Sequence, residues 1–218
     1  MVFSSLLFVY LFLPVNLICY AVISDVHKKN ACVLIFSLIF YAWMSPAYLI
    51  LLMIMAGVNY LGALLIEKYR GTKKAVAALV ADLAITLGFL CWFKYITFFC
   101  EVINSFFGIW GATVFEHIPL AALPAGISFY SFQLISYVVD VYTKDVDADH
   151  NYCNVLLYTS LFHQCIAGPI VRYKDIALSL KDRKTDINSM STGISRFCTG
   201  LAKKTLLANS CGSILETL

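Results

Sequence analysis

Long apolar runs are the feature that most constrains how this chain can fold. Apolar residues make up 61% of the 218 residues and charged residues only 13%, whereas about a quarter of a typical soluble domain is charged. Several of the runs reach the length of about 20 residues that a helix needs to cross the hydrocarbon layer of a bilayer. The sequence therefore predicts an all-α protein, a polytopic bundle of transmembrane helices.

Basic residues between the first runs predict how these helices are oriented. Lys28 and Lys29 follow the first run, and the basic loop Glu67–Lys74 follows the third. If Pro46 marks a reversal of the chain, both basic segments lie on one side, and the positive-inside rule places them in the cytoplasm. We therefore expect a multi-pass protein of the plasma or inner membrane. Its first crossings are Val2–Ile23, Ala31–Trp43 and Ala47–Ile66.

The later runs predict less regular elements. Ala75–Trp110 is about 54 Å long as one helix, which fits either two helices or one crossing with an extension. Pro119–Tyr142 is a further apolar segment, with prolines near its start. Tyr152–Tyr173 is interrupted by Gly168-Pro169 and predicts a broken or re-entrant helix. Gly193–Leu207 carries apolar residues on one face and basic residues on the other, which predicts an amphipathic helix in the membrane interface.

Polar residues inside these apolar segments are the candidates for function, because such residues are costly in a bilayer and often functional. A structural role is the alternative for each: hydrogen bonds between packed helices for Asn59 and Asp82, and snorkelling to the headgroups for Lys94. The Gly168-Pro169 break favours a polar cavity, with Arg172 meeting a phosphate or a carboxylate. The predicted cavity-lining residues are Gln133, Asp140, Gln164 and Arg172, and the other candidates are Glu101 and His163.

Several classes of function receive no support from the sequence. A net charge of +3 without a basic tract does not indicate a nucleic-acid partner. The eight cysteines show no C-x-x-C spacing, so we expect neither a disulfide framework nor a metal site. No nucleotide-binding, zinc-protease or serine-hydrolase motif is present. The residues alone therefore predict a membrane protein with one polar cavity and do not distinguish an enzyme from a transporter.

Six short motifs are spread along nearly the whole chain. The first two are the opening Met1-Val2-Phe3-Ser4-Ser5, followed by an apolar helix that ends in Leu13-Pro14, and Phe40-Tyr41-Ala42-Trp43. The others are Trp92-Phe93-Lys94-Tyr95, Gly126-Ile127-Ser128-Phe129-Tyr130-Ser131-Phe132-Gln133 through Tyr137 with Asp140-Val141-Tyr142, Ile166-Ala167-Gly168-Pro169-Ile170-Val171-Arg172-Tyr173, and Arg196-Phe197 with Gly200-Leu201 and Lys203-Lys204. In their order and spacing these motifs resemble the membrane-bound O-acyltransferase family, in its alginate O-acetyltransferase branch. Each of them alone is weakly specific.

The resemblance implies an enzyme that transfers an acyl group, expected to be acetyl, to hydroxyls of an exported polysaccharide. It implies an acyl thioester such as acetyl-CoA as donor, no bound cofactor, and a polysaccharide or an extracellular acetylation protein as partner. The family's catalytic histidine lies in a more C-terminal region, so we expect it beyond Leu218 and assign no catalytic residue here. The family has proline at the position of His163. We therefore expect residues 1–218 to be one membrane-embedded domain, the N-terminal portion of a longer acyltransferase.

Two other functions stay open at this stage. A transporter or flippase of a lipid-linked sugar would use the same polar groups as a pathway, although the sequence shows no inverted repeat. A non-catalytic subunit of an export complex would need no chemistry of its own.

Overall fold

All regular elements that the structure describes are helices. The computed structural model describes residues 5–44, 46–108, 123–164, 169–183 and 186–216, and it divides into two compact units. The larger unit is Val33–Leu178, and the smaller one combines Met1–Cys32 with Ser179–Leu218. The predicted all-α fold is confirmed for these residues, whereas their organisation as a single domain stays a prediction.

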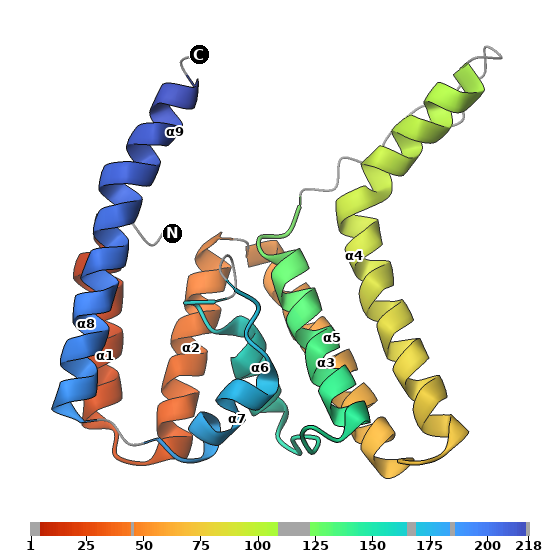
Figure 1. Cartoon of the computed structure of the whole chain (residues 1–218), viewed down its shortest axis with the longest axis horizontal. Coiled ribbons are helices and arrows are strands. Elements are labelled where there is room, and N and C mark those ends of the chain that lie inside the picture. The colour runs from red at the N-terminus through yellow and green to blue at the C-terminus, as the bar shows by residue number, and fades with distance from the viewer. Residues whose placement is uncertain (1–4, 45, 109–122, 165–168, 184–185, 217–218) are drawn as a thin grey trace. The chain divides into compact units, whose positions relative to one another are not determined.

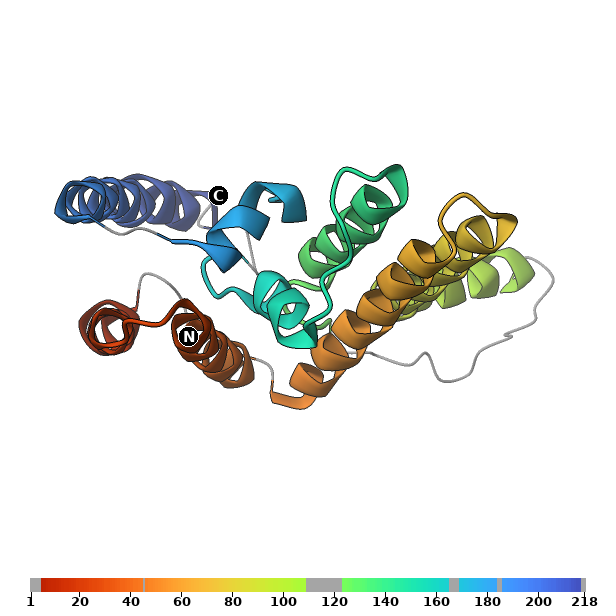
Figure 2. The same cartoon turned by 90° about the horizontal axis from the view of Figure 1, so that it is seen from below.

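The larger unit is built around α3 (Figures 1 and 2), which contacts three other helices. Its elements are most of α2 (Val26–Met44), α3 (Pro46–Lys68), α4 (Lys73–Gly108), α5 (Ile127–Thr143), α6 (Tyr152–Ser160) and most of α7 (Tyr173–Lys181). The helices α4 and α5 flank α3 and also touch each other, while α6 packs against α3 and α5. Its most buried large side chains include Tyr41, Met55, Tyr130, Tyr137 and Tyr158.

The end of α2 and the start of α3 match the prediction, whereas α2 begins at Val26, earlier than the predicted Ala31. The first ends at Met44 and the second begins at Pro46, where a proline loses no hydrogen bond because the first N–H groups of a helix have no intrahelical partner. The predicted basic loop becomes a tight turn between α3 and α4, with Gly71 at φ +79°. Among the described helices, α3 and α4 are long and apolar enough to cross a membrane.

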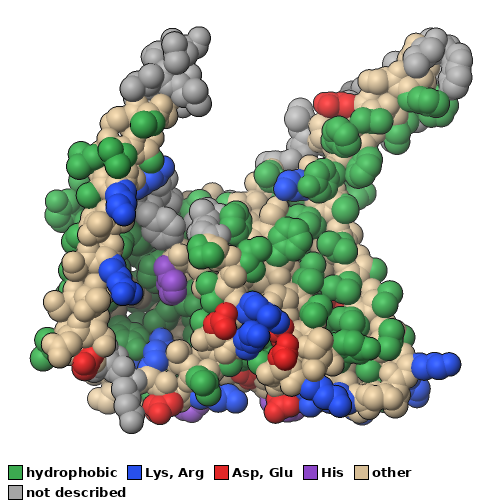
Figure 3. All heavy atoms as spheres, viewed as in Figure 1, with side chains coloured by type: hydrophobic (Ala, Val, Ile, Leu, Met, Phe, Trp, Pro, Cys, Tyr) green, Lys and Arg blue, Asp and Glu red, His purple; other side chains and the backbone are tan. Residues whose placement is uncertain are grey.

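The helix α4 decides between the two readings of the run Ala75–Trp110. Its 36 residues form one continuous helix, about 54 Å long at 1.5 Å per residue. Most of its apolar side chains face outward, and Figure 3 shows hydrophobic side chains along its length. Val80, Trp92 and Phe98 are each nearly 60% exposed at 59%, 59% and 58%, as expected for a helix that borders lipid.

Two predicted segments are shorter than expected. The helix α5 begins only at Ile127, after Gly126 with φ +73°, while the first residues of the predicted segment Pro119–Tyr142 lie outside the described residues. The helix α6 already ends at Ser160, well before Gly168, which also lies outside them. The helical conformation already ends at Leu161, with ψ 114°, whereas the predicted break at Gly168-Pro169 stays a prediction.

The smaller unit contains the two ends of the chain. It holds η1 (Phe8–Phe12) and α1 (Leu13–Val22), the first residues of α2, the last of α7, and the helical run α8 (Ile187–Ala202), η2 (Lys203–Ala208) and α9 (Asn209–Glu216). This run extends beyond the predicted amphipathic stretch Gly193–Leu207 at both ends. No side chain of α8 or η2 is buried. Its position in the membrane interface stays a prediction.

Candidate functional site

A tight turn at the end of α5 places two carboxylates side by side. Lys144 takes the left-handed conformation with φ +69° and ends the helix. The backbone N–H groups of Asp145 and Val146 then fold back to donate to the carbonyl oxygen of Asp140, at 2.9 and 3.3 Å. The chain reversal therefore brings Asp145 next to the last turn of α5, where Asp140 lies.

Arg172 binds both of these carboxylates. Its Nε donates to Asp140 Oδ2 at 3.3 Å, its Nη2 donates to Asp140 Oδ1, and the same nitrogen lies 3.6 Å from Asp145 Oδ2. The side chain of Asp140 is only 1% exposed, whereas that of Arg172 is 43% exposed. The buried carboxylate is thus neutralised by a cation that also reaches solvent or headgroups.

Tyr158 connects the segments that carry the four predicted cavity residues. Its buried hydroxyl lies 3.3 Å from the carbonyl oxygen of Gln133 and donates to that of Val171 at 2.8 Å. Its own carbonyl oxygen accepts from Gln164 Nε2 at 2.9 Å. Because Arg172 follows Val171, the structure brings all four predicted residues into one polar cluster of α5, α6 and the segment before α7. That they line a cavity stays a prediction.

Some polar atoms beside this cluster have no hydrogen-bond partner among the described residues. They are the side-chain oxygens of Ser131, Gln133 and Ser160. Buried polar atoms normally have a partner, so unpaired ones call for a water molecule or a ligand. All three lie in α5 or α6, on the two helices that Tyr158 joins.

A second set of contacts fixes the loop after α5, around Asp149. Tyr173 donates to Asp149 Oδ2 at 2.6 Å, and Asn154 Nδ2 donates to both carboxylate oxygens at 3.2 and 3.0 Å. The N–H of Asp149 donates to the Tyr137 hydroxyl at 3.0 Å. The Tyr173 ring lies 4.7 Å from that of Tyr137 and 5.2 Å from that of Tyr158.

Sequence reasoning missed Tyr137, Tyr158, Tyr173 and Asp149 as site residues. The tyrosines lie in or beside apolar runs, where they read as packing residues. Alternating acids in the loop after α5, at Asp145, Asp147 and Asp149, were the available signal. The loop is held against the end of α3, because Glu67 Oε1 accepts from the N–H of Ala148 at 3.1 Å.

The remaining candidates lie outside this cluster. Asn59 donates to Thr86 Oγ1 at 3.0 Å and so links α3 to α4. This is the hydrogen bond between packed helices that was predicted as its structural role. Neither carboxylate oxygen of the buried Asp82 has a partner among the described residues. Lys94 donates to Ser128 at 3.3 Å, and Glu101 is exposed. His163 is exposed, with its ring 5.3 Å from that of Phe162.

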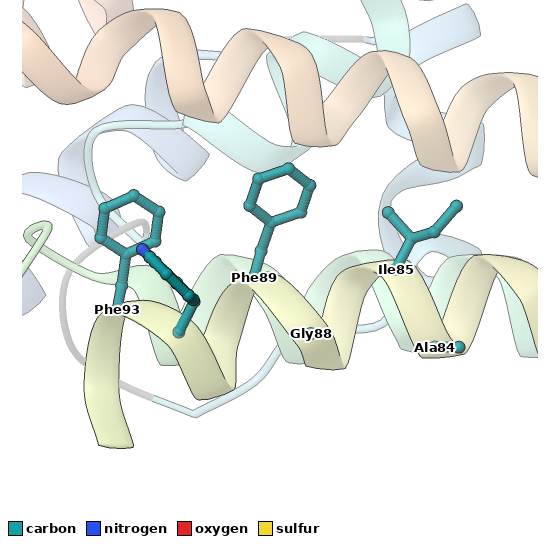
Figure 4. Close-up of a pocket in the computed structure, with 6 residues that line it drawn as sticks. Ala84, Ile85, Gly88, Phe89 and Phe93 are labelled. Carbon is teal, nitrogen blue, oxygen red and sulfur yellow. The ribbon is translucent and has the colours of Figure 1, made fainter. Parts of the chain in front are cut away.

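One pocket among the described residues is distinct from the polar cluster. It is an apolar hollow of about 430 Å³ along α4, lined by Ala84, Ile85, Gly88, Phe89, Trp92 and Phe93. Figure 4 shows Ile85, Phe89 and Phe93 pointing to the same side of α4, towards a neighbouring helix. Phe93 meets Tyr48 of α3 edge to face at 5.8 Å. Within the described residues no group of acidic, histidine and cysteine side chains is arranged to hold a metal ion.

Comparison with known proteins identifies relatives over almost the whole chain. The probable alginate O-acetylase AlgI of Pseudomonas aeruginosa is 34% identical over 99% of the chain, and that of Pseudomonas putida is 35% identical over 99%. The peptidoglycan O-acetyltransferase of Helicobacter pylori is 28% identical over 96%. The chain spans 41%, 44% and 45% of the lengths of these three relatives. No family model and no solved structure matches the chain.

These relatives confirm the resemblance that the motifs predicted. The chain is homologous to alginate O-acetylases along 99% of its length. Together with the two apolar helices α3 and α4, the relatives identify it as a membrane protein.

Proposed function

We propose that this chain forms part of a membrane O-acyltransferase that transfers an acetyl group to hydroxyls of an exported polysaccharide. The alignment of almost the entire chain with O-acetylases named for two different polymers carries this proposal. Alginate and peptidoglycan differ in their sugars, but both names describe esterification of a polysaccharide. The shared chemistry therefore supports the reaction class.

The polar cluster around Tyr158 supports a role in binding a polar substrate within the membrane. The Asp140–Arg172 pair and the unpaired oxygens of Ser131, Gln133 and Ser160 offer both charged and neutral hydrogen-bonding groups. In the proposed reaction an acceptor hydroxyl attacks the carbonyl of an acyl thioester such as acetyl-CoA. The thiolate leaves, and the hydroxyl proton passes to a base. We assign no base among the residues of this chain.

The proposed setting is a multi-pass protein of the plasma or inner membrane. Such a protein would connect an acyl donor on one side with a polysaccharide, or an acetylation partner protein, on the other. No observation on the described residues or from the relatives favours a flippase or a non-catalytic export subunit.

A chimaera tests the proposal. The aligned portion of the Pseudomonas aeruginosa relative is replaced by this chain in a strain that lacks its own enzyme, and base-labile acetate on the secreted alginate is measured. We expect acetylation above that of the deletion strain. Arg172→Gln in the chimaera should reduce it at least tenfold, whereas Lys73→Gln, in the exposed turn before α4, should not. A chimaera that reaches the membrane in normal amounts without restoring any acetate would contradict the proposal.

A further inference from the structure

Two cations in the smaller unit share one aromatic ring. Lys29 Nζ lies 4.8 Å from the centroid of the Tyr20 ring, and Arg183 Cζ lies 5.7 Å from it. Lys29 begins α2 and Tyr20 ends α1, while Arg183 lies more than 150 residues later in the chain, just after α7. The fold of this unit therefore brings two positive charges together that are distant in sequence.

Asn30 holds this arrangement in place. The side chain is 6% exposed, and its Nδ2 donates to the carbonyl oxygen of Leu180 at 2.8 Å. Its Oδ1 accepts from Arg183 Nη2. One buried amide thus fixes both the backbone at the end of α7 and the guanidinium that follows, so the cationic group is positioned before any ligand arrives.

Neither cation is neutralised within the described part of the chain. No carboxylate oxygen there lies within 4 Å of Lys29 or Arg183; the nearby Asp25 instead accepts from the backbone N–H of Lys28 at 3.0 Å. Arg183 Nε is buried and has no hydrogen-bond partner among the described residues. Both cations lie against the same ring, so positive charge is concentrated there, and an unpaired guanidinium N–H is costly. An anion would balance the charge and accept from that N–H.

The position of the site in the chain indicates which anion fits. Tyr20 lies in the last turn of the apolar helix α1, and tyrosines are enriched where membrane helices meet the lipid headgroups. Ile18 and Val22 beside it are 63% and 79% exposed and offer apolar surface to acyl chains. The exposed charges nearby in sequence are balanced, with Lys28 and Lys181 against Asp25 and Asp182, so Lys29 and Arg183 carry the excess positive charge. Basic pockets at the ends of membrane helices bind anionic headgroups, and a guanidinium matches the geometry of a phosphate.

We propose that Lys29, Arg183 and Tyr20 form a binding site for the headgroup phosphate of an anionic phospholipid. The lipid joins the α1–α2 connection to the segment after α7, which is otherwise held to it by Asn30. The acyl chains lie along the exposed residues of α1. Neither the proposed acyl transfer nor its substrates are needed for this site, which rests on the smaller unit alone.

Native mass spectrometry of the full chain in a neutral detergent tests the proposal. The protein is titrated with phosphatidylglycerol or phosphatidylcholine, and bound lipid is counted. We expect one phosphatidylglycerol to bind at least tenfold more tightly than phosphatidylcholine. Lys29→Gln and Arg183→Gln should each weaken it about tenfold, as the loss of one charge-assisted contact. Lys73→Gln removes an exposed lysine of the larger unit and should leave it unchanged.

Lys29→Gln leaves the hydrogen bonds of Asn30 to Leu180 and Arg183 intact. This variant therefore tests lipid binding even if Arg183→Gln disturbs folding. Equal binding by the native chain and Lys29→Gln overturns the proposal, and so does equal affinity for the two lipids. Complete displacement of the lipid by millimolar inorganic phosphate also overturns it, because the ligand would then be a free anion without a requirement for acyl chains.

Discussion

Replacing Gly62 by alanine should separate α3 from α4, because Asp82 occupies the space that the new methyl group needs. A Cβ at this position would lie 2.3 Å from Asp82 Oδ1, 2.9 Å from its Cγ and 3.2 Å from its Cβ. The two contacts with the carboxylate are the severe ones. The side chain of Asp82 is buried, so it leaves them only by rotating within the packed interface or by a separation of the two helices. The 3.2 Å contact with the Cβ of Asp82 needs a shift of no more than a few tenths of an ångström.

The magnitude follows from two opposing effects. Overpacking of this kind costs about 1–3 kcal/mol, while alanine in place of glycine inside a helix contributes about 0.5–1 kcal/mol of stability. We expect Gly62→Ala to lower the free energy of unfolding by about 1–2 kcal/mol. Gly88→Ala is the matched control, because a Cβ there meets no atom within 4 Å. It should be neutral or stabilising.

Reversible unfolding in mixed micelles, followed by tryptophan fluorescence and circular dichroism, measures both variants. Combining Gly62→Ala with Asp82→Ala should recover about 1–2 kcal/mol of the loss, because the carboxylate that clashes is gone. The reasoning is refuted if Gly62→Ala is as stable as Gly88→Ala. It is refuted equally if the effects of Gly62→Ala and Asp82→Ala simply add.

Three further changes test the polar contacts. Tyr158→Phe leaves the part-buried carbonyl of Val171 without its 2.8 Å donor and should lower the free energy of unfolding by about 1–2 kcal/mol. Tyr142→Phe, on an exposed tyrosine, should not change it. Asp140→Asn weakens the hold on Arg172, so limited trypsin digestion should cleave after Arg172 several-fold faster; an unchanged rate would show that other contacts hold the segment. Asp186 caps α8 by accepting from the N–H of Ser189 at 2.9 Å, and bonds from Ser189 lower the pKa of its carboxyl. The stabilisation of α8 by the Asp186 carboxylate is therefore complete above the ordinary aspartate pKa of about 4, and it is lost as the pH falls through the lower pKa that Asp186 has in the folded chain. Helicity, measured by circular dichroism, should drop in that pH range. Asp186→Asn should abolish this pH-dependent drop.

The helical framework was predictable because its signals are local. The apolar runs gave α2, α3 and α4 to within a few residues, with the exception of the start of α2, where the helix extends over Val26–Asn30. Periodicity could not decide between one and two helices in α4, because an apolar run of any length satisfies both. The helix α7 does not stand out in the sequence as an apolar run, because only Tyr173 and Leu180 are buried in it and charged residues interrupt it at Lys174, Asp175 and Lys181.

The candidate site was predictable as a set of residues but not as a set of contacts. Asp140 and Arg172 both stood out as charges beside apolar runs, yet they are 32 residues apart and nothing in the sequence pairs them. The position of Tyr158 between α5 and the segment before α7 depends on how α6 packs, which is a tertiary property. A tyrosine in an apolar run gives the same pattern whether its hydroxyl is paired or not.

Two buried carboxylates of the larger unit, Asp140 and Asp82, differ in whether they have a partner among the described residues. Asp140 is paired with Arg172 and lies in the cluster that holds the unpaired oxygens of α5 and α6. Asp82 faces Gly62 between two lipid-bordering helices and has no partner among the described residues. A buried carboxylate without a partner is costly, so packing alone is a poor reason for its presence. The single variant Asp82→Ala, measured with Gly62→Ala in the unfolding experiment, therefore also tests the role of Asp82. If Asp82→Ala is more stable than the native chain, Asp82 has a role other than holding α3 against α4.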